Sequence, residues 1–139
     1  MKMVLRAACC VCLCLLGCGS EPAYVGPARY ALSGKVTLDG APLDGGTISF
    51  IPQSKGNPAG GPIAKGEYSV APDNGANAGS YRVEVRWLRP TGEKYKDDDT
   101  GQMIDVVKEA IPPKYNESSE LKAEISAEKK SFDFELNSK

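Results

Sequence analysis

The stretch Tyr81-Arg82-Val83-Glu84-Val85-Arg86-Trp87 (residues 81–87) alternates apolar and charged side chains without interruption. Successive side chains of a β-strand point to opposite faces of a sheet, so the apolar residues of this stretch share one face and the charged residues the other. The stretch therefore predicts a strand whose apolar face is buried and whose charged face is solvated and joined by cross-strand charge pairs.

The same alternation recurs on both sides of this stretch. Turn-forming pairs such as Asp39-Gly40 and Asn74-Gly75 separate the alternating segments, and the chain contains 15 glycines and 10 prolines. No helical period of useful length occurs. The pattern predicts an all-β fold, an antiparallel β-sandwich of about seven strands in which the first two strands form a hairpin or near neighbours. The other predicted strands are residues 32–38, 47–52, 63–64, 67–70, 121–125 and 132–136.

The length of 139 residues accommodates one core, which we place in residues 30–137. Residues 53–61 are predicted to be a loop, and residues 88–110 an irregular insertion, within which Met103, Ile104, Val106 and Val107 indicate a short helix or an edge strand. The formal net charge of −1 provides no electrostatic footprint for nucleic acid, so we expect no nucleic-acid partner.

The amino-terminal residues have the pattern of an export signal. Lys2 and Arg6 flank the start of an apolar run, residues 7–16, which is shorter than the about 20 residues of a membrane-spanning helix. All 5 cysteines lie in residues 1–18, so no disulfide is expected in the domain. Four of them are interleaved with valine and leucine, where cysteine acts as a small apolar residue; a thiolate metal site is the alternative interpretation.

The end of this signal, Leu15-Leu16-Gly17-Cys18, resembles a bacterial lipobox. The resemblance implies a short helical signal peptide over residues 1–17, acyl chains on the thiol of Cys18, and a flexible tether over residues 18–29. Two acyl chains hold a protein stably on a membrane. Gly19 after the cysteine favours the outer membrane, and an ordinary secreted protein cleaved near Gly17 is the alternative.

The segments 33–43 and 45–50 resemble the opening of carboxypeptidase-regulatory-like domains, which belong to the transthyretin-like (prealbumin-like) β-sandwiches. Segments 66–70, 79–85 and 132–136 fit the same pattern, and the whole chain is similar to small lipoproteins of planctomycete-type bacteria, with residues 111–116 as a recurring late segment. The resemblance implies an accessory, binding or structural module. One enzymatic branch of the group uses histidines and a characteristic C-terminal tetrapeptide to hydrolyse 5-hydroxyisourate, and this chain has neither.

The chemistry available to the chain is narrow. It contains no histidine, which excludes Ser-His-Asp triads, Cys-His pairs and histidine-containing zinc sites. We therefore predict no catalytic residues, no metal site and no cofactor, and Cys18 as the lipid-attachment residue. The acidic cluster Asp97-Asp98-Asp99 lacks the ligand spacing of an EF-hand and has Lys94 and Lys96 beside it, so it is interpreted as a solvated loop. Trp87 and Tyr81 are assigned to the core rather than to a carbohydrate-binding surface.

Together these features predict a membrane-anchored extracytoplasmic lipoprotein that acts as a non-enzymatic binding or structural module, facing the periplasm or the cell surface. Its expected partners are the membrane, through the lipid, and an envelope protein or a carbohydrate. Two alternatives remain open. A carboxylate-dependent carbohydrate-active enzyme requires two acidic residues converging in a concave pocket, and a Ca²⁺-dependent adhesion module requires a cation site.

Overall fold

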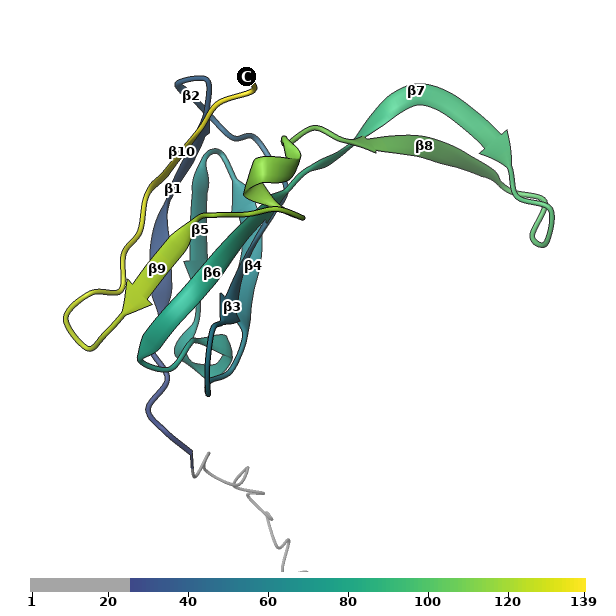
Figure 1. Ribbon diagram of the computed structural model, residues 1–139. Helices are drawn as coiled ribbons and strands as arrows, with labels where there is room; N and C mark the ends of the chain where they lie inside the picture. Colours follow the sequence, from purple (N-terminus) through teal and green to yellow (C-terminus); the bar gives the residue numbers. More distant parts are fainter. Residues whose placement is uncertain (1–25) are drawn as a thin grey trace, which may run out of the picture.

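The computed structural model describes residues 26–139, which form an all-β fold, as the alternation predicts (Figure 1). Two short 3-10 helices, η1 (Pro72–Asn74) and η2 (Pro113–Tyr115), connect strands. The strands are β1 (Leu32–Leu38), β2 (Ala41–Pro42), β3 (Thr47–Pro52), β4 (Ala59–Ala64), β5 (Glu67–Val70), β6 (Gly79–Arg86), β7 (Leu88–Lys96), β8 (Met103–Glu109), β9 (Lys122–Ile125) and β10 (Phe134–Leu136).

The body of the molecule is one curled sheet of 8 strands in the order β10-β1-β5-β4-β3-β6-β9, with β2 attached to β1. Strands β1 and β10 are parallel, and the other pairs of this sheet are antiparallel. Strand β4 belongs to both halves of the curl, because its residues 59–62 pair with β3 and its residues 63–64 pair with β5. The curl thereby produces two facing layers, β10-β1-β5 and β3-β6-β9.

The core lies between these two layers. Phe50 of β3 is fully buried, and its ring centroid lies 5.8 Å from that of Tyr68 on β5 and 6.4 Å from those of Phe132 and Phe134. Aromatic side chains therefore join the layers at the centre of the sandwich. The residues predicted to face inward are buried, apart from Gly34, Leu38, Trp87 and Leu121, which are half-buried.

The charged face of residues 81–87 is on the outside of β6, as predicted, but its ion pairs run along the strand rather than across it. Glu84 lies between two arginines, with its carboxylate 2.8 Å from the guanidinium of Arg82 and 3.5 Å from that of Arg86. Residues two apart on one strand share a face, which brings these charges together without help from a neighbouring strand.

Two expectations about the strands are wrong. The first two predicted strands are not neighbours: β1 pairs with β10, β2 and β5, whereas β3 pairs with β4 and β6 in the opposite layer. The predicted loop 53–61 ends early, because β4 begins at Ala59 and not at Ile63. The predicted turn at Asp39-Gly40 is confirmed and joins β1 to β2, with φ of 51° and 81°, respectively.

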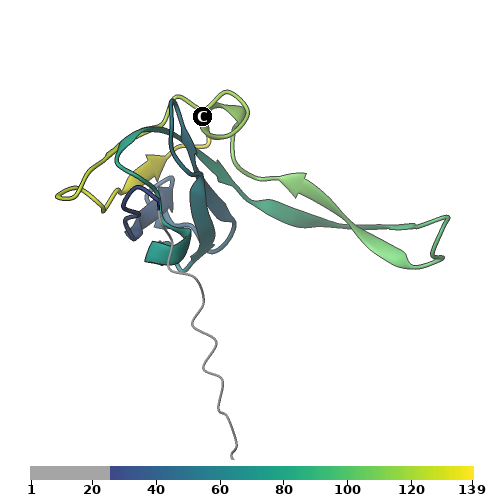
Figure 2. The same cartoon turned by 90° about the horizontal axis from the view of Figure 1, so that it is seen from below.

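Residues 88–110, predicted to be an irregular insertion, are instead a hairpin of β7 and β8, whose register shifts between Pro90 and Lys94. The hairpin forms a separate 2-stranded sheet that pairs with no other strand of residues 26–139. Figures 1 and 2 both show it as a long, curved projection from one end of the sandwich. We call β7, β8 and the turn between them the arm.

The first described residues run along the opposite end of the sandwich from the arm (Figure 1). The buried side chain of Asn77 donates hydrogen bonds to the carbonyls of Pro27 and Ala28, both at 3.0 Å. The backbone of Tyr30 bonds in both directions with that of Ala76. The end of the predicted tether is thus fastened to the domain.

Candidate functional site: the arm and its root

Nearly all of the arm is solvent-exposed. Every residue of β7 is exposed, and β8 has only Val106 and Glu109 half-buried. With about 3.3 Å of rise per residue, the 9 residues of β7 extend over roughly 30 Å. An isolated two-stranded hairpin has little stability of its own in water. The arm is therefore a long hairpin that no other layer of residues 26–139 covers.

The exposed large apolar side chains of residues 26–139 all belong to the arm. Their exposed fractions are 60% for Leu88, 52% for Tyr95, 60% for Met103, 38% for Ile104 and 50% for Val107. Single exposed apolar residues are ordinary on protein surfaces, but their concentration on one element marks an interaction site.

The strand register shows how these side chains are distributed over the two faces of the arm. Tyr95 is directly opposite Ile104, so both lie on one face, which Val106 extends toward the root. Pro90 is opposite Val107 on the other face. Paired residues of an antiparallel ladder share a face, so both faces of the arm carry apolar surface and neither is turned toward the core.

The charges of the arm are separated along its length. The tip carries Asp97, Asp98 and Asp99, next to Lys96. Near the root, Arg89 is directly opposite Lys108 in the ladder. Like charges in directly opposed positions destabilise a strand pair. Midway, Lys94 and Asp105 form an ion pair of 3.3 Å that neutralises both.

The acidic tip is a hydrogen-bonded turn. The carboxylate of Asp97 accepts hydrogen bonds from the backbone N–H of Thr100 at 2.7 Å and from its hydroxyl at 2.6 Å. These bonds lower the pKa of Asp97 below its ordinary value. Gly101, with φ of 70°, closes the turn. Within residues 26–139 no three His, Cys, Asp or Glu residues are grouped as ligands for a metal ion.

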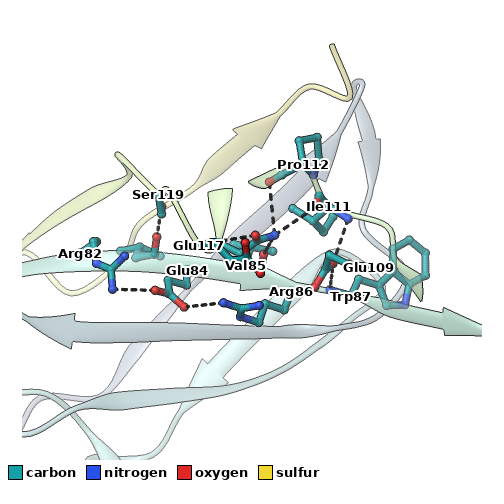
Figure 3. A network of polar contacts seen from close by, with 12 residues as sticks. Arg82, Glu84, Val85, Arg86, Trp87, Glu109, Ile111, Pro112, Glu117 and Ser119 are labelled. Carbon is teal, nitrogen blue, oxygen red and sulfur yellow. Dashed lines mark hydrogen bonds and ion pairs between the residues drawn. The ribbon is translucent and has the colours of Figure 1, made fainter. Parts of the chain in front are cut away.

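The root of the arm is fixed by Glu109. One carboxylate oxygen accepts hydrogen bonds from the backbone N–H groups of Trp87 at 2.8 Å and Ile111 at 3.0 Å (Figure 3). The N–H of Ala110 donates to the carbonyl of Trp87 at 2.9 Å. The residues flanking the arm on both strands are therefore tied together, which sets the direction in which the arm leaves the body.

The indole of Trp87 is closely packed. A Cβ added at Gly45 would lie 2.8 Å from the indole nitrogen, so only glycine fits there. The guanidinium of Arg89 stacks over the ring, 4.7 Å from its centroid. The indole thus supports the root of the arm, and its face is already covered by Arg89.

A loop after the arm is anchored by buried polar side chains. The amide of Asn116 donates to the carbonyls of Ile111 at 3.1 Å and Pro112 at 3.3 Å, and its oxygen accepts the N–H of Glu117 at 2.8 Å. The hydroxyl of Ser119 bonds the carbonyl of Val83 on β6 (Figure 3). Segment 111–119 thereby locks against β6, next to the root.

The structure places the sequence-predicted residues as follows. Cys18, the predicted lipid-attachment residue, lies outside the described residues. Tyr81 is in the core, and its hydroxyl bonds Asn57 and Asn77; this confirms the core assignment. Trp87 packs at the edge of the core. The sequence did not predict the hydrogen bonds of Glu109 and Asn116, although Asn116 lies in the late segment 111–116, because their partners are backbone groups.

Comparison of the chain with protein-family models, with curated proteins and with solved structures finds no match. Among residues 26–139, no helix has the length and apolar character needed to cross a membrane.

Proposed function

We propose that this chain is a membrane-anchored extracytoplasmic lipoprotein and a non-enzymatic binding module whose binding surface is the arm. The observation that carries the proposal is that the exposed large apolar side chains of residues 26–139 are gathered on one projecting hairpin with a fixed root. The transthyretin-like character suggested by segments 33–50 fits an accessory module of this kind.

The chemistry of the arm favours a protein partner over a carbohydrate. Sugars are commonly bound on exposed aromatic rings with convergent polar groups. The arm offers mainly aliphatic side chains, and the indole of Trp87 at its root is covered by Arg89. Apolar and aromatic side chains on a projecting element are typical of the anchors of protein interfaces.

The two carboxyl groups whose pKa is displaced do not fit the general acid that the enzymatic alternative requires. A general acid in glycoside hydrolysis needs a raised pKa. Asp39 and Asp97 both have a lowered pKa, because each accepts hydrogen bonds from a nearby residue, Ser138 and Thr100, respectively. Both carboxyl groups are therefore ionised at neutral pH.

The arrangement of the two ends of the sandwich fits a tethered binding module. The chain joins the sandwich at Pro27 and Ala28, at the end opposite the arm (Figure 1). Acyl chains on Cys18 would hold the end of the sandwich at Pro27 and Ala28 toward the bilayer, with the root of the arm at the other end and the arm projecting sideways from it (Figure 1).

Replacing Cys18 by alanine is expected to move the protein from the membrane fraction to the soluble fraction in its native host. The physical reason is the loss of the acyl chains, each buried CH₂ of which contributes about 0.8 kcal/mol to membrane binding. Cys14→Ala is the matched control, since it removes a thiol from the same segment. Unchanged membrane association of the Cys18→Ala variant would refute the anchor.

Site-specific photo-crosslinking tests the arm as the binding surface. We expect a photoreactive phenylalanine analogue placed at Tyr95 or Val107 to give a discrete protein adduct in intact cells, identified by mass spectrometry. The same analogue at Lys122, an exposed position on β9, is the control and should give none. Equal crosslinking from the control position, or no adduct from either arm position, would contradict the proposal.

A further inference from the structure

We propose that the partner of the arm is the arm of a second copy of this chain, paired antiparallel through the free edges of the two β8 strands. The inference rests on the proposed function, in which the arm is the binding surface. It adds the identity of the partner and the geometry of the contact.

The free edges of β7 and β8 differ in how well they can hydrogen-bond to another strand, and that of β8 is the better suited. Strand β7 contains Pro90, which has no N–H to donate, and its register shifts between Pro90 and Lys94. Prolines and bulges are features that prevent edge-to-edge pairing. Strand β8, Met103-Ile104-Asp105-Val106-Val107-Lys108-Glu109, has no proline, glycine or bulge, and within residues 26–139 it pairs only with β7.

Charge decides the orientation of the second copy. The tip of the arm is acidic, with Asp97, Asp98 and Asp99 offset in part by Lys96. Near the root, Arg89 is opposite Lys108, and the carboxylate of Glu109 beside them is bound to backbone N–H groups, which leaves the root with a net positive charge. Each cluster contains like charges that repel within one copy. Antiparallel pairing of two arms directs the acidic end of each arm toward the basic end of the other copy, and the two-fold symmetry does so twice.

The apolar side chains fit the same arrangement. An antiparallel β8 pair centred on Val106 places Val106 of one copy opposite Val106 of the other, and Ile104 opposite the aliphatic stem of Lys108. The apolar strips of the two arms then become continuous across a four-stranded sheet. Such a sheet gains the stability that a solitary hairpin lacks.

A lipid surface is the competing occupant for an exposed apolar hairpin, and the tip is poorly suited to it. Insertion of the arm into a bilayer would lead with Asp97, Asp98 and Asp99, all of which lie at the end of the hairpin. Carboxylates in the membrane interior are costly, and anionic headgroups would repel them. A second copy offers a basic root, whose positive charge is complementary to these carboxylates.

Charge reversal with cross-complementation provides the test. The tip variant Asp98→Lys/Asp99→Lys retains Asp97, whose carboxylate caps the turn through Thr100. The root variant is Arg89→Glu/Lys108→Glu. We expect the full chain in detergent solution to dimerise, and each variant alone to dimerise at least about tenfold more weakly in sedimentation or light scattering.

A 1:1 mixture of the tip and root variants should dimerise again, because every tip then meets a root of opposite charge. A chain carrying all four substitutions should dimerise with itself for the same reason, and this recovery shows that the substituted arms still fold. A monomeric wild-type chain, dimerisation of both variants at wild-type strength, or a mixture without recovery would each overturn the pairing.

The outcomes separate this inference from the proposed function. A monomeric chain whose Tyr95 crosslinks to a different protein would overturn the self-pairing and leave the arm as a binding surface. If the chain neither dimerises nor gives arm-specific crosslinks, both the self-pairing and the arm as a binding surface are overturned. A salt-dependent dimer that the tip and root substitutions control would support both.

Discussion

Replacing Phe50 by alanine is expected to reduce the free energy of unfolding by about 4 kcal/mol. The side chain is fully buried, and its ring contacts Tyr68, Phe132 and Phe134 across the two layers. Removing it forfeits the apolar transfer energy and leaves a cavity that a curled sheet with rigid hydrogen-bonded strands cannot close. Small domains have a total stability of only about 5–15 kcal/mol, so the loss is a large fraction of it.

Urea denaturation followed by circular dichroism measures this effect. Ser49→Ala is the matched control, because Ser49 adjoins Phe50 on β3 but is exposed on the opposite face of the sheet. We expect the control to change stability by less than about 0.5 kcal/mol. A Phe50→Ala variant with a loss below about 1 kcal/mol would contradict the two-layer core.

Gly34→Ala is expected to cost about 3 kcal/mol for a different reason, steric overlap. A Cβ at this position of β1 would lie 1.9 Å from the carbonyl oxygen of Phe132 and 2.9 Å from the hydroxyl of Tyr68. That same carbonyl accepts the hydrogen bond of the Tyr68 hydroxyl at 2.8 Å. Relief of the overlap requires the chain at Phe132 to move away, which breaks this buried bond.

Gly61→Ala is the control for this substitution. A Cβ at Gly61 of β4 would have its nearest neighbour, the carbonyl oxygen of Ser69, at an ordinary contact distance of 3.5 Å. Thermal unfolding should show a Tm lowered by about 10 °C for Gly34→Ala and little changed for Gly61→Ala. Equal Tm values for the two variants would show that segment 131–133 does not pack on β1 as described.

The alternation of apolar residues predicted the all-β class and which side chains of each strand face the core. Tyr81, Val83 and Val85 are fully buried, as their spacing requires. The pairing of strands was not predictable in the same way. Alternation indicates which face of a strand is buried but not which strand lies beside it, so β1 and β3 were assigned as neighbours although the curl separates them.

The arm escaped prediction because its pattern differs from that of a strand with one buried face. Both faces carry a mixture of apolar and charged residues, for example Tyr95 and Ile104 with Lys108 on one face and Val107 with Lys94 on the other. A strand that buries neither face has no reason to alternate. The cluster at 103–107 was recognised as a candidate strand edge, but nothing local showed that its partner is residues 88–96.

The polar residues that anchor the loops and the root of the arm were also not predictable from the sequence. Asn116, Asn77 and Glu109 make hydrogen bonds mainly to backbone groups, some of them about 50 residues away, as between Asn77 and Pro27. A hydrogen bond to a backbone group does not depend on the partner's side chain, so the sequence pattern does not reveal it. Such residues are identified only when the fold brings the backbone groups to them.

The position of the arm in the topology has an evolutionary consequence. Strands β6 and β9 are direct neighbours in the body, and the two ends of the arm are held together by the bond between Ala110 and Trp87. The sandwich is therefore complete without the hairpin inserted at that point. A lineage could lengthen, shorten or recharge the hairpin to exchange one recognition specificity for another, while selection on the stability of the body continued undisturbed.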